Sequence, residues 1–109
     1  MSGWYVLKRS GDQYMFNLKA GNSEVILTSE RYTAKSGAQN GIASVQTNSP
    51  KDERFERKTS KSGEPYFVLK AGNGETIGRS EMYSSSSACE NGIASVKRNG
   101  PTTNIRDET

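Results

Sequence analysis

The chain has 109 residues, of which 31% are hydrophobic, and its 15 basic and 12 acidic side chains give a formal net charge of +3. This length and composition predict one domain with a small core and a strongly polar surface. The absence of histidine and the presence of only one cysteine exclude an intramolecular disulfide, a Cys–His catalytic pair and the usual zinc sites.

The N-terminal sequence lacks the charged segment and apolar run of a signal peptide, and no stretch reaches the roughly 18 apolar residues of a membrane span. We therefore expect a cytoplasmic protein without membrane association, cofactor or metal. The charges at 51–58 alternate in sign, which is more typical of a solvated strand or linker than of a phosphate-binding track.

Three strands are expected first. Aromatic and branched residues at 4–8 predict a strand that ends at the Ser-Gly-Asp of 10–12. A period of two from Tyr14 to Ala20 predicts a second strand with one buried face. Gly-Asn-Ser at 21–23 then predicts a tight turn into a third strand at 24–28.

The period next changes to that of a helix. Ala38, Gly41, Ile42 and Val45 fall on one helical face, and the Asn-Ser-Pro of 48–50 predicts the helix end. Hydroxyl side chains at 33–36, and at 84–87 in the second half, offer several N-caps among which the sequence does not choose. A glycine inside a helix costs about 0.5–1 kcal/mol relative to alanine. We therefore expect close approach of the helix to the sheet at Gly41, with a backbone ligand site as the alternative.

The second half of the chain repeats the first. Shifted by 51 positions, residues 16–50 align with residues 67–101 without a gap, and 20 of the 35 positions are identical. The repeat predicts three more strands, beginning with one at 55–59, and a second helix with its own mid-helix glycine, Gly92. A short last strand is expected within 102–107. In this alignment Trp4 and Phe55 occupy matching positions, and we expect both to anchor the core.

The expected fold is α+β: two tandem β-β-β-α repeats plus a C-terminal strand, in one mainly antiparallel sheet with both helices packed on one face and pseudo-two-fold symmetry. A repeat of about 50 residues is near the lower limit for an independent core. We therefore expect a single domain, 1–109, whose intertwined repeats cover about 3–50 and 54–101. Because the repeats satisfy each other, a monomer is expected.

Three motifs occur in both halves: Leu-Lys-Ala-Gly-Asn followed by Glu, Ser-Glu-x-Tyr, and Asn-Gly-Ile-Ala-Ser-Val. In this combination the chain resembles the YegP-like family of small bacterial proteins. The resemblance covers nearly the whole chain. It implies tandem β(3)-α-β units that form one sheet with exchanged C-terminal strands, an arrangement that single-repeat relatives would reach as homodimers. It implies no activity and no functional residue.

The candidate binding residues are Lys19, Lys70, Tyr66, Tyr32 and Tyr83. Alternation along the strands predicts that the first three point away from the helices. The outward set also includes Met15 and Val68, with Tyr5 and Leu7 as candidate neighbours. Tyr32 and Tyr83 each lie between a third strand and a helix, where a structural role at the core edge and a ligand contact are the alternatives.

Three functions follow from these residues. The first is a non-enzymatic module that binds a protein partner through the open sheet face. The second is weak nucleic-acid binding through the basic and aromatic residues of the same face. The third is an enzyme that uses repeated carboxylates, Glu24 with Glu75 or Glu30 with Glu81. The first pair follows a turn and is expected to be solvated, and the second pair precedes a helix, where negative charge is favourable near the N-terminal dipole. Cys89 aligns with Ala38 and is expected to be buried and inert, so we expect no catalytic residue.

Overall fold

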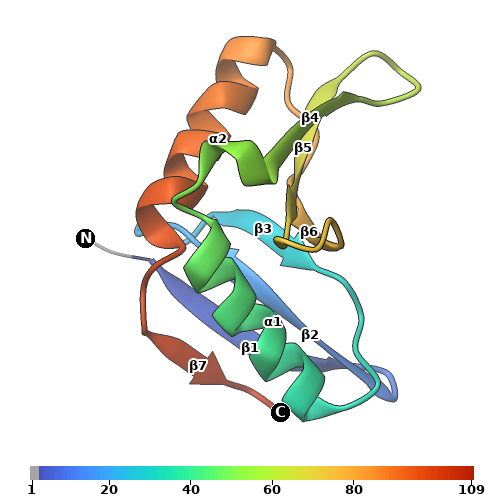
Figure 1. The fold of residues 1–109 in the computed structure, drawn as a ribbon, viewed down its shortest axis with the longest axis vertical. Helices are drawn as coiled ribbons and strands as arrows, with labels where there is room; N and C mark the ends of the chain where they lie inside the picture. The colour runs from blue at the N-terminus through green and yellow to red at the C-terminus, as the bar shows by residue number, and fades with distance from the viewer. Residues whose placement is uncertain (1–2) are drawn as a thin grey trace.

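The computed structural model describes residues 3–109 as one seven-stranded sheet with two helices packed against one face (Figure 1). In chain order the elements are β1 Trp4–Ser10, β2 Gln13–Lys19, β3 Val25–Ser29, α1 Lys35–Asn48, the 3-10 helix η1 Asp52–Arg54, β4 Phe55–Thr59, β5 Pro65–Lys70, β6 Thr76–Arg79, α2 Ser86–Asn99 and β7 Ile105–Asp107. The predicted α+β architecture is confirmed. Within the described range, neither helix has the length and apolar character needed to cross a membrane.

The two repeats meet at the centre of the sheet. The strand order is β4-β5-β6-β3-β2-β1-β7, and β3 joins β6 through the pairs Thr28–Arg79 and Ser29–Gly78. The approach is close, because a Cβ on Gly78 would lie 2.7 Å from the carbonyl oxygen of Thr28. A pseudo-two-fold axis between β3 and β6 relates the three strands of each repeat.

The last strand crosses from the second repeat to the first. β7 runs parallel to β1, where the Tyr5 amide donates to the Asn104 carbonyl (2.9 Å) and the Glu108 amide donates to the Leu7 carbonyl (2.8 Å). Figure 1 shows this strand beside β1, at the opposite edge of the sheet from β4. One C-terminal strand therefore crosses between the repeats. The reciprocal crossing implied by the family resemblance is not seen in residues 3–109, where β4 forms the other edge of the sheet.

Both helices contribute to a single core. The predicted apolar face of α1, including Gly41 and Ile42, is buried, and α2 buries the equivalent face. The N-caps differ between the helices. Ser85 caps α2, since its Oγ accepts the Ala88 amide at 3.1 Å. The N-cap of α1 is Ala34, so a hydroxyl cap on that helix is a wrong prediction.

The predicted match of Trp4 with Phe55 is wrong. Tyr5 pairs with Leu18 as Phe55 pairs with Leu69, so it is Tyr5 that takes the place of Phe55 in the core. The cause is one extra residue in the second hairpin: Gly11 and Asp12 form the first turn, whereas the second has three residues between Ser60 and Glu64. A slip of one residue moves every side chain of a strand to the other face.

The same slip corrects the outward set. Tyr5 and Leu7 face the helices and are buried, whereas Trp4 and Val6 lie on the open face. The notion that Tyr5 and Leu7 join an exposed surface is therefore wrong, because the ungapped alignment could not detect the longer turn.

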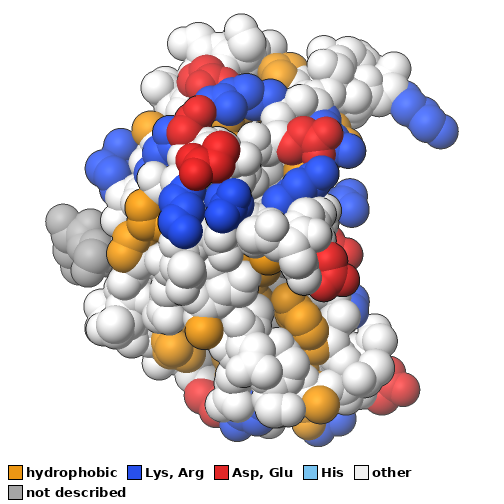
Figure 2. Space-filling view, viewed as in Figure 1, with side chains coloured by type: hydrophobic (Ala, Val, Ile, Leu, Met, Phe, Trp, Pro, Cys, Tyr) orange, Lys and Arg blue, Asp and Glu red, His pale blue; other side chains and the backbone are white. Residues whose placement is uncertain are grey.

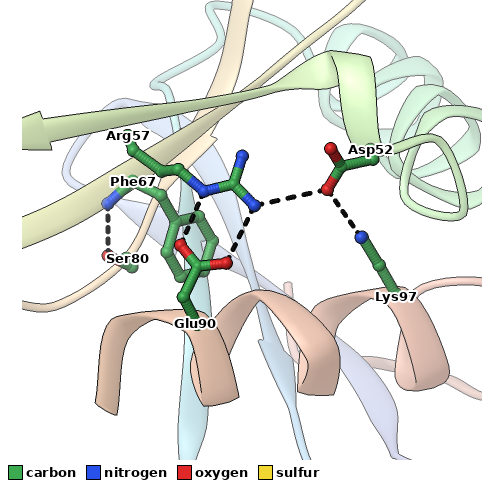
Figure 3. A network of polar contacts seen from close by, with 6 residues as sticks. All are labelled: Asp52, Arg57, Phe67, Ser80, Glu90 and Lys97. Carbon is green, nitrogen blue, oxygen red and sulfur yellow. Dashed lines mark hydrogen bonds and ion pairs between the residues drawn. The ribbon is translucent and has the colours of Figure 1, made fainter. Parts of the chain in front are cut away.

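A charged network occupies the place in repeat two that Leu7 fills in repeat one. Arg57 donates from Nε to Glu90 Oε2 at 2.6 Å and from Nη2 to Asp52 Oδ1 at 3.3 Å, and Lys97 Nζ lies 2.7 Å from the same Asp52 oxygen (Figure 3). Hydrogen bonds from Lys97 and Arg57 hold the pKa of Asp52 below its ordinary value, and the Arg57 hydrogen bond does the same for Glu90. The network ties η1 and β4 to α2.

Candidate functional site

The five candidate residues lie on two opposite sides of the molecule. Lys19, Lys70 and Tyr66 lie on the open face of the sheet. Tyr32 and Tyr83 lie on the helix side, where each packs against the core. The structure therefore does not assemble the five residues into one surface.

The open face is a continuous surface of cross-strand neighbours. Directly paired residues point to the same side of a sheet. One such row crosses all seven strands and consists of Arg106, Val6, Asn17, Thr28, Arg79, Val68 and Glu56. With about 4.8 Å between strands, the six spacings of the row span about 29 Å.

Positive charge gathers on this face. Strand pairing places six cationic side chains there and one anionic side chain, Glu56; the cations are Lys8, Lys19, Lys58, Lys70, Arg79 and Arg106. Lys70 Nζ lies 2.6 Å from Glu56 Oε1, and this contact with the lysine lowers the pKa of Glu56. Among the strand residues that point to the open face, six positive charges minus one negative charge give a net charge of +5.

The helix side has a different charge pattern. Figure 2 shows acidic and basic side chains mixed together on that side. The segregation of charge is therefore a property of the fold. The sequence does not show it, because each of the six cations comes from a different strand.

The open face presents little apolar surface. Met15 and Val68 point to it as predicted, but they are only 7% and 5% exposed. The Arg106 guanidinium lies 4.6 Å from the centre of the Trp4 ring and covers part of the indole. Val25, at 38% exposure, is the main apolar side chain that this face leaves open, beside a groove of about 520 Å³ between β3 and the segment after β6.

Two clefts related by the pseudo-two-fold axis lie on the helix side. The first has a volume of about 590 Å³ and lies between α1 and the turn that joins β5 to β6 in the other repeat. Its polar lining is Glu30, Tyr32, Asn40, Ser44, Asn73, Glu75 and Thr76. The second, of about 280 Å³, is lined by Glu81, Tyr83, Asn91, Ser95, Asn22 and Glu24. Nine of the ten residues lining the second cleft are identical to their counterparts in the first.

Backbone contacts and packing position the tyrosine of each cleft. Tyr32 exchanges two backbone hydrogen bonds with Tyr14, at 2.7 and 2.8 Å, and its ring stacks on Phe16 at 6.4 Å between centroids. Its hydroxyl lies over Gly41, where a Cβ would come within 2.5 Å of Oη and 2.9 Å of Phe16 Cε2. The predicted close approach at the mid-helix glycine is thus confirmed, and the tyrosine is the nearest neighbour.

The second tyrosine is held in the same way. The Tyr83 amide donates to the Pro65 carbonyl at 2.8 Å, and the ring stacks on Phe67 at 6.3 Å. A Cβ on Gly92 would collide with the Tyr83 hydroxyl. The tyrosine and the glycine occur together in both copies, so packing against the tyrosine ring explains the glycine. Packing does not explain why the ring carries a hydroxyl.

The serine of the Ser-Glu-x-Tyr motif has a structural role. Ser29 Oγ accepts the Phe16 amide at 2.9 Å and donates to the Glu30 carbonyl at 2.7 Å. Ser80 makes the same contact with Phe67, at 3.0 Å (Figure 3). This buried serine fixes the chain so that the glutamate and tyrosine that follow it are directed to the cleft.

The carboxylates pair across the repeats. Glu30 meets Glu75 in the first cleft and Glu24 meets Glu81 in the second, so like residues do not meet at the pseudo-dyad. Glu75 is fixed by its turn: its amide donates to Asn73 Oδ1, and Asn73 Nδ2 donates to Glu75 Oε1, both at 3.0 Å. All four carboxylates are exposed, which confirms the expected solvation of Glu24 and Glu75.

Burial and these charges act on the phenols. Burial, followed by the charges of Glu30 and Glu75, raises the pKa of Tyr32. Burial raises the pKa of Tyr83 to about 12, with smaller contributions from nearby negative charges that include Glu81. Both phenols are therefore neutral at physiological pH and can donate a hydrogen bond.

Other chemistry finds little support in residues 3–109. No group of three or more His, Cys, Asp or Glu side chains in this range could hold a metal ion. Cys89 is 2% exposed, as expected, and burial raises the pKa of its thiol. A thiol in this state is a weak nucleophile.

Comparison with known proteins places these features in a family. A family model described as a domain of unknown function, DUF1508, matches residues 10–56 and again residues 60–107. The chain belongs to this family. A UPF0339 protein of Bordetella pertussis is 63% identical over 109 residues, covering 100% of this chain and 98% of the relative. The UPF0339 protein YegP of Escherichia coli is 54% identical over 110 residues, covering 100% of both chains.

Solved structures of family members share the fold. The solution NMR structure of YegP from Escherichia coli matches with a TM-score of 0.95 at 54% identity, covering 100% of this chain and 95% of that one. The solution NMR structure of a UPF0339 protein from Shewanella oneidensis matches with a TM-score of 0.92 at 60% identity, covering 98% and 92%. The resemblance to the YegP-like family is therefore confirmed, and the tandem matches to DUF1508 agree with the internal repeat.

Sequence reasoning missed the clefts as units. Each combines a helix of one repeat with a turn of the other, and nothing in one repeat indicates which turn it will meet. A signal was nevertheless present: Glu30, Asn40 and Glu75 are identical to their counterparts although none of them is buried.

Proposed function

We propose that this protein is a non-enzymatic binding module whose open sheet face binds single-stranded nucleic acid. The observation that carries the proposal is the segregation of six cationic side chains and one anionic side chain onto that face. Nucleic-acid binders gather positive charge on one face, where it displaces the counterions of the phosphates. A sheet face without a helix across it is also a common platform for unpaired bases.

The aromatic residues of the face fit this role. Tyr66 is half-buried beside Lys58, and Trp4 lies beside Lys19. A base that stacks on Tyr66 places its phosphate near Lys58, which is the usual arrangement in single-strand binding, whereas Arg106 covers part of the Trp4 ring. The low apolar exposure of the face favours this ligand over a protein partner, which reverses the order of our expectations from the sequence.

The test is a titration with fluorescently labelled single-stranded DNA and RNA at two salt concentrations. If four cations contact phosphates, the slope of log K against log salt is about −3, because each neutralised phosphate contributes about −0.7. The double substitution Lys19→Glu with Lys70→Glu weakens binding. Lys51→Glu with Arg98→Glu is the matched control, because it makes the same charge change at exposed positions away from the strands. No binding at low salt, or equal loss in both double variants, refutes the proposal.

A protein partner is the second candidate, favoured by the groove of about 520 Å³ beside Val25. The groove is lined by apolar side chains together with Arg79, Glu24 and Glu81. This mixture of apolar and charged groups is typical of a surface that binds another protein. Affinity capture with wild type and with Val25→Glu tests it. A partner that both proteins retain equally counts against the groove.

We also propose that the protein acts as a monomer in the cytoplasm. The support for the monomer is that the two repeats already complete one sheet, so no second chain is needed for closure. Sedimentation equilibrium tests this, and a stable dimer at micromolar concentration contradicts it. Cell fractionation tests the location.

A further inference from the structure

The two clefts contain polar side chains that folding does not explain. Glu30, Tyr32 and Asn40 are identical in both repeats, yet within residues 3–109 their side chains have no hydrogen-bond partner. The same is true of their counterparts Glu81, Tyr83 and Asn91. By contrast, Ser29 and Asn73 are occupied with backbone and turn contacts.

The lining of each cleft accepts hydrogen bonds and carries negative charge. The first cleft presents the carboxylates of Glu30 and Glu75, the amide oxygen of Asn40, and the hydroxyls of Tyr32 and Ser44, with no lysine or arginine in its wall. The second presents the same set. A group that enters must therefore supply both N–H donors and positive charge to be complementary.

We propose that each cleft binds an organic cation through an ammonium or guanidinium group held between the two glutamates, the tyrosine hydroxyl and the asparagine. The first cleft shares no residue with the groove beside Val25 on the open face, whereas the second cleft shares Glu24 and Glu81 with that groove. Glu75 is preorganised by Asn73, which reduces the entropy lost when the cation is bound.

The first cleft is the larger site. Ala88 replaces Gly37 in the wall of the second, whose volume is about 280 Å³ against about 590 Å³. The upper value lies in the usual range for small-molecule sites and the lower value is just below it. The structure therefore assigns the bulkier ligands and the higher affinity to the first cleft.

The shared chemistry has two sources, a free polyamine and the side chain of a lysine or arginine on another protein. Two probes distinguish them: spermidine, and a short unstructured peptide containing one lysine and one arginine. Each is titrated at low salt into the full chain and followed by amide chemical shifts.

The expected result is that shifts concentrate at residues 40–44 and 73–77, and more weakly at 91–95 and 22–26. Glu30→Gln with Glu75→Gln weakens binding at the first cleft at least tenfold and leaves the second unchanged. Glu53→Gln with Glu64→Gln, an equal charge loss at exposed positions outside both clefts, changes neither site.

Tighter binding of spermidine identifies a free amine as the ligand, and tighter binding of the peptide identifies a side chain. Shifts spread over all exposed carboxylates, or equal weakening by both double variants, would mean counterion attraction only and would overturn the site. The absence of saturable binding by either probe would also overturn it. Since nucleic acid is absent from these titrations, the proposal stands or falls separately from the function of the sheet face.

Discussion

The substitution Gly41→Ala tests why a glycine lies in the middle of α1. The new Cβ would lie 2.5 Å from Tyr32 Oη, 2.9 Å from Tyr32 Cζ and 2.9 Å from Phe16 Cε2, all closer than atoms normally pack. Overpacking of this kind costs about 1–3 kcal/mol. Alanine also returns about 0.5–1 kcal/mol of helix preference. We expect a net loss of about 1 kcal/mol in the free energy of unfolding.

Urea denaturation followed by circular dichroism measures this value. Gly37→Ala in the same helix is the matched control, because its Cβ would lie 3.3 Å from Tyr32 Cδ1 and the second repeat already carries Ala88 there. We expect the control to be neutral or more stable. Gly41→Ala combined with Tyr32→Phe should recover part of the loss, since the nearest contact is removed. If Gly41→Ala is as stabilising as the control, the clash with Tyr32 is not the reason for the glycine.

Three further outcomes follow from the structure. Because the carboxylates of Asp52 and Glu90 have lowered pKa values, their contribution to stability is present at neutral pH and is lost as pH falls below about 4. Arg57→Ala should therefore flatten the fall in stability between pH 5 and 3, and an unchanged fall contradicts the network. Absorbance titration should find a phenol with a pKa of about 12, and Tyr83→Phe should remove it. If the substitution instead removes a phenol with the ordinary pKa of about 10, the burial of Tyr83 is contradicted. Deletion of residues 104–109 should lower stability by at least about 1–3 kcal/mol, because the pairing of β7 with β1 is lost together with two flanking hydrogen bonds worth about 0.5–1.5 kcal/mol each. Chemical denaturation of the shortened protein measures this loss, and an unchanged free energy of unfolding would mean that β7 does not stabilise the fold.

Most of the fold could be predicted because each repeat has clear periods. The alternation from Tyr14 to Ala20 and the helical spacing from Ala38 to Val45 depend on side-chain direction, which local backbone geometry determines. The helix ends followed from proline, and the last strand followed from the position after α2. The one-residue difference between hairpins was beyond this reasoning, because a short turn and a longer turn connect the same strands equally well. Trp4 was consequently placed in the core that Tyr5 occupies.

The candidate site could be predicted only in part. Alternation placed Lys19, Lys70 and Tyr66 correctly on the open face, but it could not reveal that Lys58, Arg79 and other cations gather beside them. That clustering depends on strand order, which joins residues far apart in the sequence. Alternation also could not predict how exposed an outward side chain would be, since Met15 points to the open face and is only 7% exposed.

The crossing of β7 to β1 has a consequence for folding cooperativity. In stacked repeat proteins each unit contacts only its neighbours, and segments can unfold independently. Here the end of the second repeat pairs with the first strand of the first, and the Tyr5 hydroxyl donates to the Gly100 carbonyl at 2.6 Å. Loosening either repeat therefore exposes the hydrogen-bonding edge of the other. The duplicated chain should unfold in a single step, and fragments divided near residue 51 should gain structure only when mixed.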